Sequence, residues 1–426
     1  MKLRFKQFIS SHKSLAESFF SLSVLNLIES LLPLITMPYI LRVVGAANYG
    51  VYSYILIIIQ YLQIFNAYGF NFSATKQISQ NREDTTIINR TYSSVLTCRL
   101  LLFIGGAMIV LTLSPFLMDN KEQLLMYCMG LGIVFGDSLN PIWLFQGKEK
   151  MRYMTIVNAS TKIFFTLLIF IFIRKAEDYV YLILYQSLGY IISGILSTII
   201  AIRIFKVHFS IPSWNDIAFQ FKDGFAVFSS TIGINLYRNA NIFILKFFVS
   251  DAALGVYSAA EKIIKGIQML TNPIAQALFP HMSLVFKQHT LDENLKTLRK
   301  SALVLSAILG IAMVMTLLFA EWIVTLLCGS EYLEAVRLVR IMAPIIVIAG
   351  LNYILGIVGL INLNYPRAFL YSVFIAGILS IIGLSVFAPK YGIIAGALAM
   401  LGAECVLLIC ILFSLIRLMR KNIILH

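Results

Sequence analysis

Residues 301–320 read SALVLSAILGIAMVMTLLFA, a run without a single charged side chain. A helix needs about 20 apolar residues to cross the hydrocarbon core of a bilayer. Similar runs follow one another along the chain, with only short polar breaks between them. We therefore predict an all-α, polytopic membrane protein with about 12 transmembrane helices. The predicted spans are 18–41, 49–73, 92–114, 123–145, 154–173, 180–202, 224–248, 254–284, 301–320, 336–360, 368–388 and 393–416.

The composition of the chain agrees with this class. Only 13% of the residues are charged and 59% are hydrophobic, whereas a soluble domain carries about 25% charged residues. The loops between the spans are too short to hold a soluble domain. No phosphate-binding loop, catalytic motif or metal-ligand spacing is visible, and the five cysteines lie in or beside apolar spans. We predict that the protein is not an enzyme and has no cofactor and no metal site.

The positive charge of the chain indicates its orientation. The net charge is +14, but most Lys and Arg residues lie in the two terminal segments and in every second loop. Cytoplasmic loops of membrane proteins carry such an excess. The pattern therefore places both termini in the cytoplasm and gives no reason to expect a nucleic-acid partner.

An internal repeat divides the chain into halves. An offset of 205 residues aligns Gly50-Val51-Tyr52-Ser53 with Gly255-Val256-Tyr257-Ser258, and it also pairs Gln60 with Lys265 and Gln63 with Gln268. Parallel repeats of this kind are known among transporters. We predict an N-lobe at 1–206, a cytoplasmic linker at 207–223 and a C-lobe at 224–426.

Several predicted spans carry polar or charged residues at bilayer depth. Such residues are costly unless they face protein, water or a counter-ion, so each is a functional candidate. In the eighth span, polar residues recur every three or four positions and share one helical face. They are Tyr257, Glu261, Lys265, Gln268, Asn272 and Gln276. This stripe is predicted to line an aqueous cavity or the seam between the lobes.

Two interpretations of the deep charges remain open. In the first, they form interhelical or local ion pairs, such as Glu29 with Lys162 or Glu261 with Lys265. In the second, a surplus of cations creates a cavity for an anionic substrate, because Arg and Lys are the usual partners of phosphate. The candidate cavity residues are Arg99, Lys162, Arg238, Lys262, Lys265, Gln60, Gln63, Gln268 and Asn272. The candidate acids for ion or proton coupling are Glu29, Asp137, Glu261 and Glu404.

Prolines interrupt several of the same spans. Pro33 and Pro38 lie in the first, Pro141 in the fourth, Pro273 and Pro280 in the eighth, and Pro344 in the tenth. Proline removes a helical hydrogen bond and leaves a kink or a flexible point. Kinked helices suit a bundle that rocks between two open states, although static packing explains them as well.

Four segments together resemble Wzx-type polysaccharide flippases, the polysaccharide biosynthesis proteins of the MOP superfamily. The first segment runs from PYILRVVG at 38–45 through Asn48-Tyr49-Gly50. The others are QGKEKM at 146–151, GVYSAAEKI at 255–263 and CGSEYLEA at 328–335. The resemblance extends over nearly the whole chain.

This resemblance implies a two-lobed bundle in the bacterial cytoplasmic membrane. It would move undecaprenyl-diphosphate-linked oligosaccharide across the bilayer by alternating access, and the diphosphate would be the anion that the cationic cavity binds. The implied partners are this lipid-linked oligosaccharide and the bilayer, with a polysaccharide polymerase and a chain-length regulator as candidates. Members of the family commonly carry an acid near the position of Asn239 or Asn241, which leaves coupling at that point in doubt here.

Two alternatives compete with this function. One is an exporter of drugs or small metabolites from the same superfamily, although cationic drugs would call for a net acidic cavity. The other is a flippase for another lipid-linked precursor. The sequence separates the second poorly from the oligosaccharide flippase.

Overall fold

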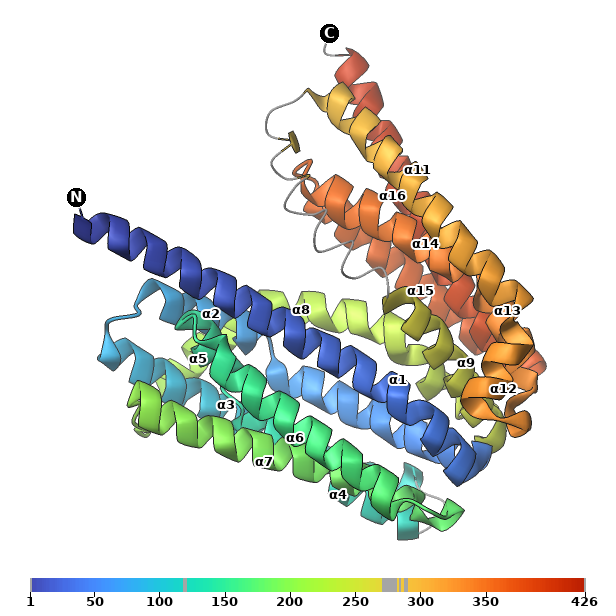
Figure 1. Ribbon diagram of the computed structural model, residues 1–426, viewed down its shortest axis with the longest axis horizontal. Helices are drawn as coiled ribbons and strands as arrows, with labels where there is room; N and C mark the ends of the chain where they lie inside the picture. The colour runs from blue at the N-terminus through green and yellow to red at the C-terminus, as the bar shows by residue number, and fades with distance from the viewer. Residues whose placement is uncertain (1, 118–120, 270–281, 283–284, 287–289, 425–426) are drawn as a thin grey trace. The chain divides into compact units, whose positions relative to one another are not determined.

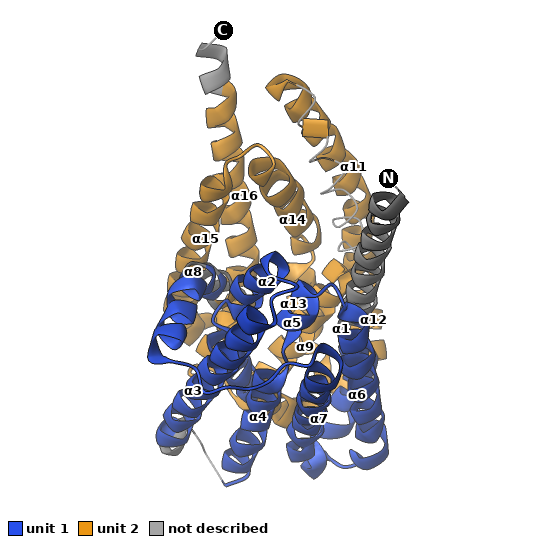
Figure 2. Ribbon diagram, turned by 90° about the vertical axis from the view of Figure 1, so that its left-hand side faces the viewer, with its two compact units in different colours: residues 1–44, 54–232 blue, residues 45–53, 233–426 orange. Residues whose placement is uncertain are grey.

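The computed structural model describes residues 2–117, 121–269, 282, 285–286 and 290–424, and within these ranges it contains helices and no strands (Figure 1). The chain forms two compact units. The first consists of 1–44 and 54–232, and the second of 45–53 and 233–426 (Figure 2). The last boundary between the two units, at 232–233, falls inside helix α8 (Trp214–Leu245). The predicted lobes and linker, which differ from this division, remain a prediction.

The first unit is built from antiparallel helices joined by short turns. Among these, α4 packs against α7, α7 against α6, and α2 against α5. The helices are α1 (Lys2–Ala67, apart from 45–53), α2 (Phe70–Gln80), α3 (Thr85–Leu117), α4 (Lys121–Leu139), α5 (Ile142–Gly147), α6 (Met151–Phe172), a 3₁₀ turn (Ala176–Asp178), α7 (Tyr179–Phe205) and the first part of α8 (Trp214–Leu245).

The second unit contains the end of α8 and the helices that follow it. Here α15 packs against α16, α11 against α14, and α9 against α13. The helices are α9 (Asp251–Met269), α11 (Leu291–Leu318), α12 (Ala320–Cys328), a 3₁₀ turn (Ser330–Tyr332), α13 (Glu334–Met342), α14 (Ile345–Asn352), a π-helix (Tyr353–Ile361), α15 (Pro366–Tyr391) and α16 (Ile393–Ile424).

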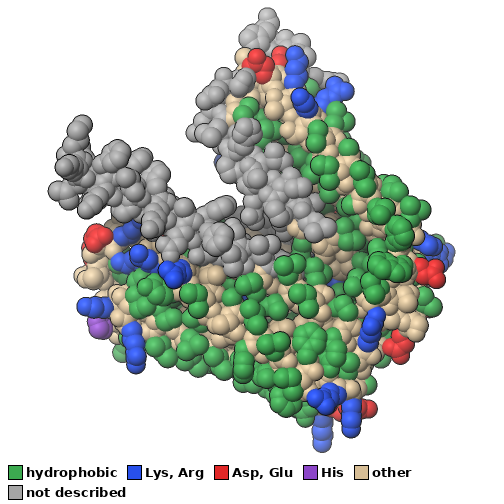
Figure 3. Space-filling model, viewed as in Figure 1, with side chains coloured by type: hydrophobic (Ala, Val, Ile, Leu, Met, Phe, Trp, Pro, Cys, Tyr) green, Lys and Arg blue, Asp and Glu red, His purple; other side chains and the backbone are tan. Residues whose placement is uncertain are grey.

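Nine helices or helix pairs within the described residues are long and apolar enough to cross a membrane. One of them, Leu31–Gln80, contains parts of the first two predicted spans. The predicted spans 224–248 and 254–284 are not among the nine, and the second of these lies partly outside the described residues. Large hydrophobic side chains face outward on these helices, such as Ile311 and Leu318 on α11. Figure 3 shows many hydrophobic side chains on the visible surface of the described residues, as expected of helices that face lipid.

Helix breaks fall at some of the predicted points and not at others. The chain interrupts its helix at Asn140-Pro141 and turns at Pro344, because neither proline can continue the hydrogen-bond ladder. Pro33 and Pro38, by contrast, both lie inside α1. The break in α1 comes instead at Gly45, whose φ of 74° favours glycine.

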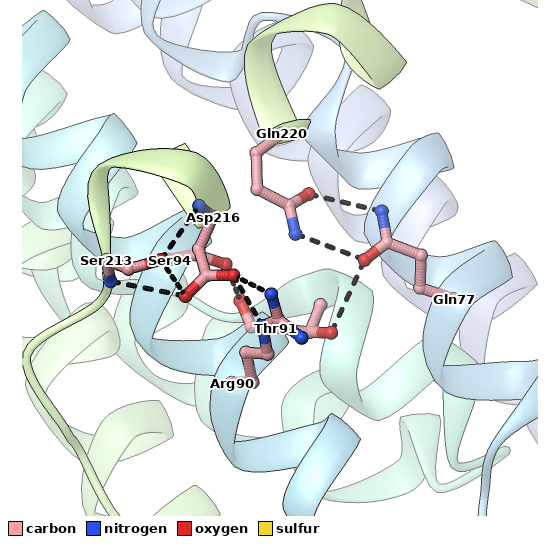
Figure 4. Close-up of polar contacts among 7 residues, drawn as sticks. All are labelled: Gln77, Arg90, Thr91, Ser94, Ser213, Asp216 and Gln220. Carbon is pink, nitrogen blue, oxygen red and sulfur yellow. Dashed lines mark hydrogen bonds and ion pairs between the residues drawn. The ribbon is translucent and has the colours of Figure 1, made fainter. Parts of the chain in front are cut away.

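The segment before α8 and the first turns of α8 pack on α2 and α3. Val207 and Ile217 are buried in a hydrophobic cluster with Trp143 and side chains of α2 and α3. Figure 4 shows the polar contacts that residues of this region make with α2 and α3. The side chains of Gln77 and Gln220 exchange two hydrogen bonds, of 3.2 and 3.1 Å, and Arg90 forms an ion pair with Asp216. Residues of the predicted linker therefore dock on α2 and α3.

Candidate functional site

A polar cavity of about 390 Å³ lies within the second unit. Five carboxamide side chains line it, together with one lysine and one glutamate, and helices α8, α9, α14 and α16 contribute them. These polar residues are Asn235, Asn239, Asn241, Lys265, Gln268, Asn352 and Glu404. The remaining wall is mostly apolar and includes Tyr353 and Phe369. A cavity of this size, lined by a few convergent polar groups, is the usual form of a small-molecule site.

Helical spacing explains how α8 and α9 reach the cavity. Asn235 and Asn239 are four residues apart, and Lys265 and Gln268 are three apart, so each pair shares one face of its helix. The predicted stripe of the eighth span therefore reaches the cavity through Lys265 and Gln268. Further along this stripe, Asn272 lies outside the described residues.

Lys265 connects the cavity to a buried acid. Its Nζ atom lies 3.0 Å from a carboxylate oxygen of Glu261, one helical turn away, and it donates a 3.4 Å hydrogen bond to Asn239. The Glu261 side chain is 3% exposed, whereas that of Lys265 is 36% exposed. The ammonium group therefore balances a buried carboxylate while part of the lysine remains accessible from the cavity. This contact is the ion pair that the first interpretation of the sequence expected.

Glu404 is the acidic residue in the wall of the cavity. Its carboxylate accepts a 2.7 Å hydrogen bond from the Nδ2 atom of Asn352, which also donates to the backbone carbonyl of Glu404. The Oδ1 atom of Asn352 is buried and has no hydrogen-bond partner within the described part of the chain. A buried polar atom without a partner is costly. This cost is part of holding the Asn352 amide against Glu404.

A π-helix begins directly after Asn352 and carries Tyr353 and Ile357 into the cavity wall. Such widened turns are rare and occur often at functional sites. Asn352 itself was missing from the sequence prediction. The available signal was a single amide within the apolar run IIVIAGLNYILG at 345–356.

In the first unit, Arg99 and Asp137 form a buried network. Arg99 is 1% exposed, and its guanidinium lies 2.5 Å from the Asp137 carboxylate. The same side chain donates to Asn66 at 3.2 Å and to the backbone carbonyl of Asn140 at 3.1 Å. This network fixes α3 to α1 and α4. Arg99 therefore has a structural role in joining these helices. Its role in substrate binding remains a prediction.

The other candidates have varied surroundings. The Nζ atom of Lys162 lies 5.3 Å from the centre of the Tyr190 ring, and that of Lys262 lies 4.9 Å from the centre of the Tyr49 ring. Gln60 and Gln63 are half-buried on α1 in the first unit. The side chains of Glu29 and Arg238 lie outside the described set.

These positions leave the cationic cavity untested. The polar cavity of the second unit brings together Lys265, Gln268 and Glu404, and it holds one charge of each sign. The described lining of this cavity therefore carries no surplus of positive charge. No group of metal-ligating side chains occurs among the described residues.

The fold and the buried polar cavity define a polytopic helical membrane protein of the transporter type. Residues 15–286 match the sequence model of the polysaccharide biosynthesis protein family, and the chain belongs to this family. This confirms the resemblance seen in the sequence.

Two relatives and two solved structures extend the comparison. A protein of Escherichia coli K12 named "Putative O-antigen transporter" is 29% identical, with 92% of this chain and 94% of the relative covered. A Shigella dysenteriae protein of the same name is 29% identical over 71% of this chain and 75% of its own length.

The fold resembles that of the lipid II flippase MurJ in an inward closed conformation, with a TM-score of 0.74, 13% identity, and 92% and 86% of the two chains covered. An inward-facing multidrug transporter of the MATE family and MOP superfamily gives 0.70 at 14% identity over 95% and 99%. These likenesses confirm the predicted fold class.

Proposed function

We propose that this protein is a flippase that moves undecaprenyl-diphosphate-linked oligosaccharide repeat units across the bacterial cytoplasmic membrane. The observation that carries the proposal is the polar cavity, which lies inside a unit with large apolar side chains on its outer helices. The names of the two relatives and the membership of the polysaccharide biosynthesis family support the same substrate class.

The chemistry of the cavity fits the carbohydrate part of such a substrate. A carboxamide donates and accepts hydrogen bonds, as a sugar hydroxyl does. Five carboxamides around one cavity offer many such pairs without a strong charge. The diphosphate would engage cationic side chains of the kind that the sequence predicts, of which Lys265 lines the polar cavity.

The transport cycle follows from the limits of the bilayer. A sugar cannot cross hydrocarbon alone, because each unpaired polar group costs several kcal/mol there. A cavity that opens alternately to the two sides removes this cost without any covalent step. We propose that both termini are cytoplasmic, according to the distribution of Lys and Arg. The transported repeat units would then reach a polymerase and a chain-length regulator on the outer side.

The test uses a strain that makes the repeat unit and lacks this gene. Mass spectrometry of its lipid extract should show accumulated undecaprenyl-diphosphate oligosaccharide, and lectin binding to membrane vesicles of known orientation should place the sugar on the cytoplasmic side. Restoring the wild-type gene should remove the accumulation. An unchanged lipid-linked pool in cells proven to make the repeat unit would overturn the proposal and favour a small-molecule exporter.

A further inference from the structure

A second cavity lies on the α15–α16 hairpin, and it is apolar. We call it the hairpin groove. It measures about 400 Å³ and is lined by Leu379, Ser380, Gly383, Phe387, Tyr391, Ala395, Leu398, Ala399, Gly402, Ala403 and Val406. Its floor is buried at Ala395 and Ala403, whereas Leu379 and Leu398 on its rim are about half exposed. The groove therefore opens at the surface of the second unit.

The hairpin groove and the polar cavity share a wall. Ser380 and Ala403 line both spaces, so one layer of small side chains separates them. The Ser380 hydroxyl donates a 3.3 Å hydrogen bond to the backbone carbonyl of Ala399, which joins α15 to α16 at this wall. A polar chamber and an apolar groove thus lie back to back across the two helices.

At Gly350, the wall of the polar cavity is backed by a side chain of another helix. Gly350 lines the cavity, but a Cβ atom there would lie 2.2 Å from a methyl group of Leu309 on α11. The glycines that line the hairpin groove have more space around them. A Cβ atom on Gly383 or Gly402 would meet no atom of the described residues within 4 Å. Space beside the polar cavity is therefore available on the hairpin side.

We infer that the hairpin groove holds the isoprenoid tail of the lipid-linked substrate while its sugar occupies the polar cavity. This inference rests on the proposed function. An amphiphile whose head lies inside the unit must lead its tail out across a wall, and the wall at Ser380 and Ala403 has small side chains and an apolar groove beyond it.

The groove would hold the tail because its shape fits the tail and because the bound head keeps the tail close to it. Lipid tails are as apolar as the groove, so the hydrophobic effect does not drive the tail from the bilayer into it. Once the head is bound, however, the first isoprene units are held close to the wall. A preformed channel then provides packing contacts for them without a search.

The open glycines allow a test by filling the groove. Gly383→Trp and Gly402→Trp place a large side chain in open space, with Gly383→Ala and Gly402→Ala as graded variants that keep the groove open. Gly310→Trp on α11 is the matched control, because a Cβ atom at Gly310 also meets no atom within 4 Å in the described part of the chain and the residue lies outside the groove. Folded amounts are compared by size-exclusion chromatography.

The first readout is photolabelling in nanodiscs with an undecaprenyl-diphosphate-linked sugar that carries a diazirine in its tail. Labels should map to residues 379–406, and both Trp variants should lose most of this labelling while the two Ala variants and Gly310→Trp keep it. Labels confined to other helices, or equal labelling of a folded Trp variant, would overturn the tail site.

The second readout separates the tail site from the proposed function. Surface polysaccharide should fall in the deletion strain and stay low with either Trp variant, yet return with wild type and Gly310→Trp. Full return with both Trp variants would overturn the groove and leave the flippase standing. A deletion strain with normal lipid-linked pools and normal surface polysaccharide would overturn the flippase and, with it, this inference.

Discussion

Gly50 and Gly255 lie where two helical segments of the second unit touch backbone to backbone. A Cβ atom on Gly50 would lie 1.9 Å from the carbonyl oxygen of Asp251, and one on Gly255 would lie 1.9 Å from the carbonyl oxygen of Ala46. Both residue pairs related in this way, Gly50 with Gly255 and Ala46 with Asp251, are 205 residues apart. The contact therefore maps onto itself under the internal repeat.

This contact predicts that both glycines are indispensable for folding. Gly50→Ala and Gly255→Ala each drive a methyl group into backbone that cannot move aside as a side chain would. Overpacking usually costs about 1–3 kcal/mol, and a backbone clash belongs at the upper end. The folded yield and the apparent melting temperature in detergent should fall in both variants. Gly310→Ala, with open space around it, should match or exceed wild type. Normal melting of both clashing variants would contradict the close approach.

The two-lobed repeat remains a prediction, although the tetrapeptide GVYS, which occurs at both ends of this contact, is visible in the sequence. The position of the contact could not be predicted, since nothing in GVYS states that its two copies meet. The division of the chain was equally hidden. Residues 45–53 belong to the second unit although they lie in α1, because Gly45 breaks the helix and the following residues pack on α9.

The Arg99–Asp137 ion pair predicts strong coupling in a double-mutant cycle. Asp137→Ala leaves a buried guanidinium without its carboxylate, and breaking a buried pair in this way costs about 3–5 kcal/mol. The value should fall toward the lower end, because Asp137 is 29% exposed and the bonds from Arg99 to Asn66 and Asn140 remain. Arg99→Met and Asp137→Ala together should lower the melting temperature by less than the sum of the single effects. Strictly additive effects would show that the pair contributes nothing.

The candidate site was only partly predictable from sequence, for a physical reason. Lys265 and Gln268 are near each other in sequence and fall on one face by helical period, so their shared direction can be calculated. Asn352 and Glu404 come together from α14 and α16, and no local pattern joins them. Their contact depends on tertiary packing, as does the turn at Pro344 that aims Asn352 at the cavity.

Glu404→Gln separates a coupling role for this acid from a structural one. The variant keeps an oxygen that can accept the hydrogen bond from Asn352, so the melting temperature should stay close to that of wild type. If Glu404 exchanges a proton or binds a driving cation, surface polysaccharide should fall strongly, because an amide can do neither. Glu334→Gln, an exposed acid of the same unit, is the matched control. Wild-type transport by Glu404→Gln at equal protein level would remove Glu404 from the coupling candidates.

The cationic cavity predicts a loss of transport without unfolding. Lys162→Ala and Arg238→Ala each remove a charge offered to the diphosphate, so surface polysaccharide should fall while folded protein remains. Lys222→Ala, an exposed lysine on α8, should behave as wild type. If the two residues serve only in interhelical pairing, the melting temperature should drop and the transport per folded molecule should stay constant. Normal transport in both variants would end the cationic-cavity hypothesis.

The anchoring of α8 predicts a pH-dependent contribution from Asp216. The hydrogen bond from Arg90 holds the pKa of the Asp216 carboxyl below its ordinary value of 3.8, with further help from Ser213. A lowered pKa in the folded state means that the stabilisation is complete above about pH 4 and is lost as the pH falls through the lowered pKa. Because Arg90 is 67% exposed, the effect should be modest, about 0.2–1 kcal/mol.

The measurement is the difference in apparent melting temperature between wild type and Asp216→Asn at a fixed heating rate. Wild type should melt slightly higher at pH 7 and at pH 5, and the two curves should converge as the pH is lowered below 4. Added salt should shrink the difference at pH 7, since the pair is partly exposed and ions screen it. A difference that persists unchanged into acid would mean that Asp216 acts through its hydrogen bonds to Ser213, which an amide weakens at every pH, and that its charge contributes nothing.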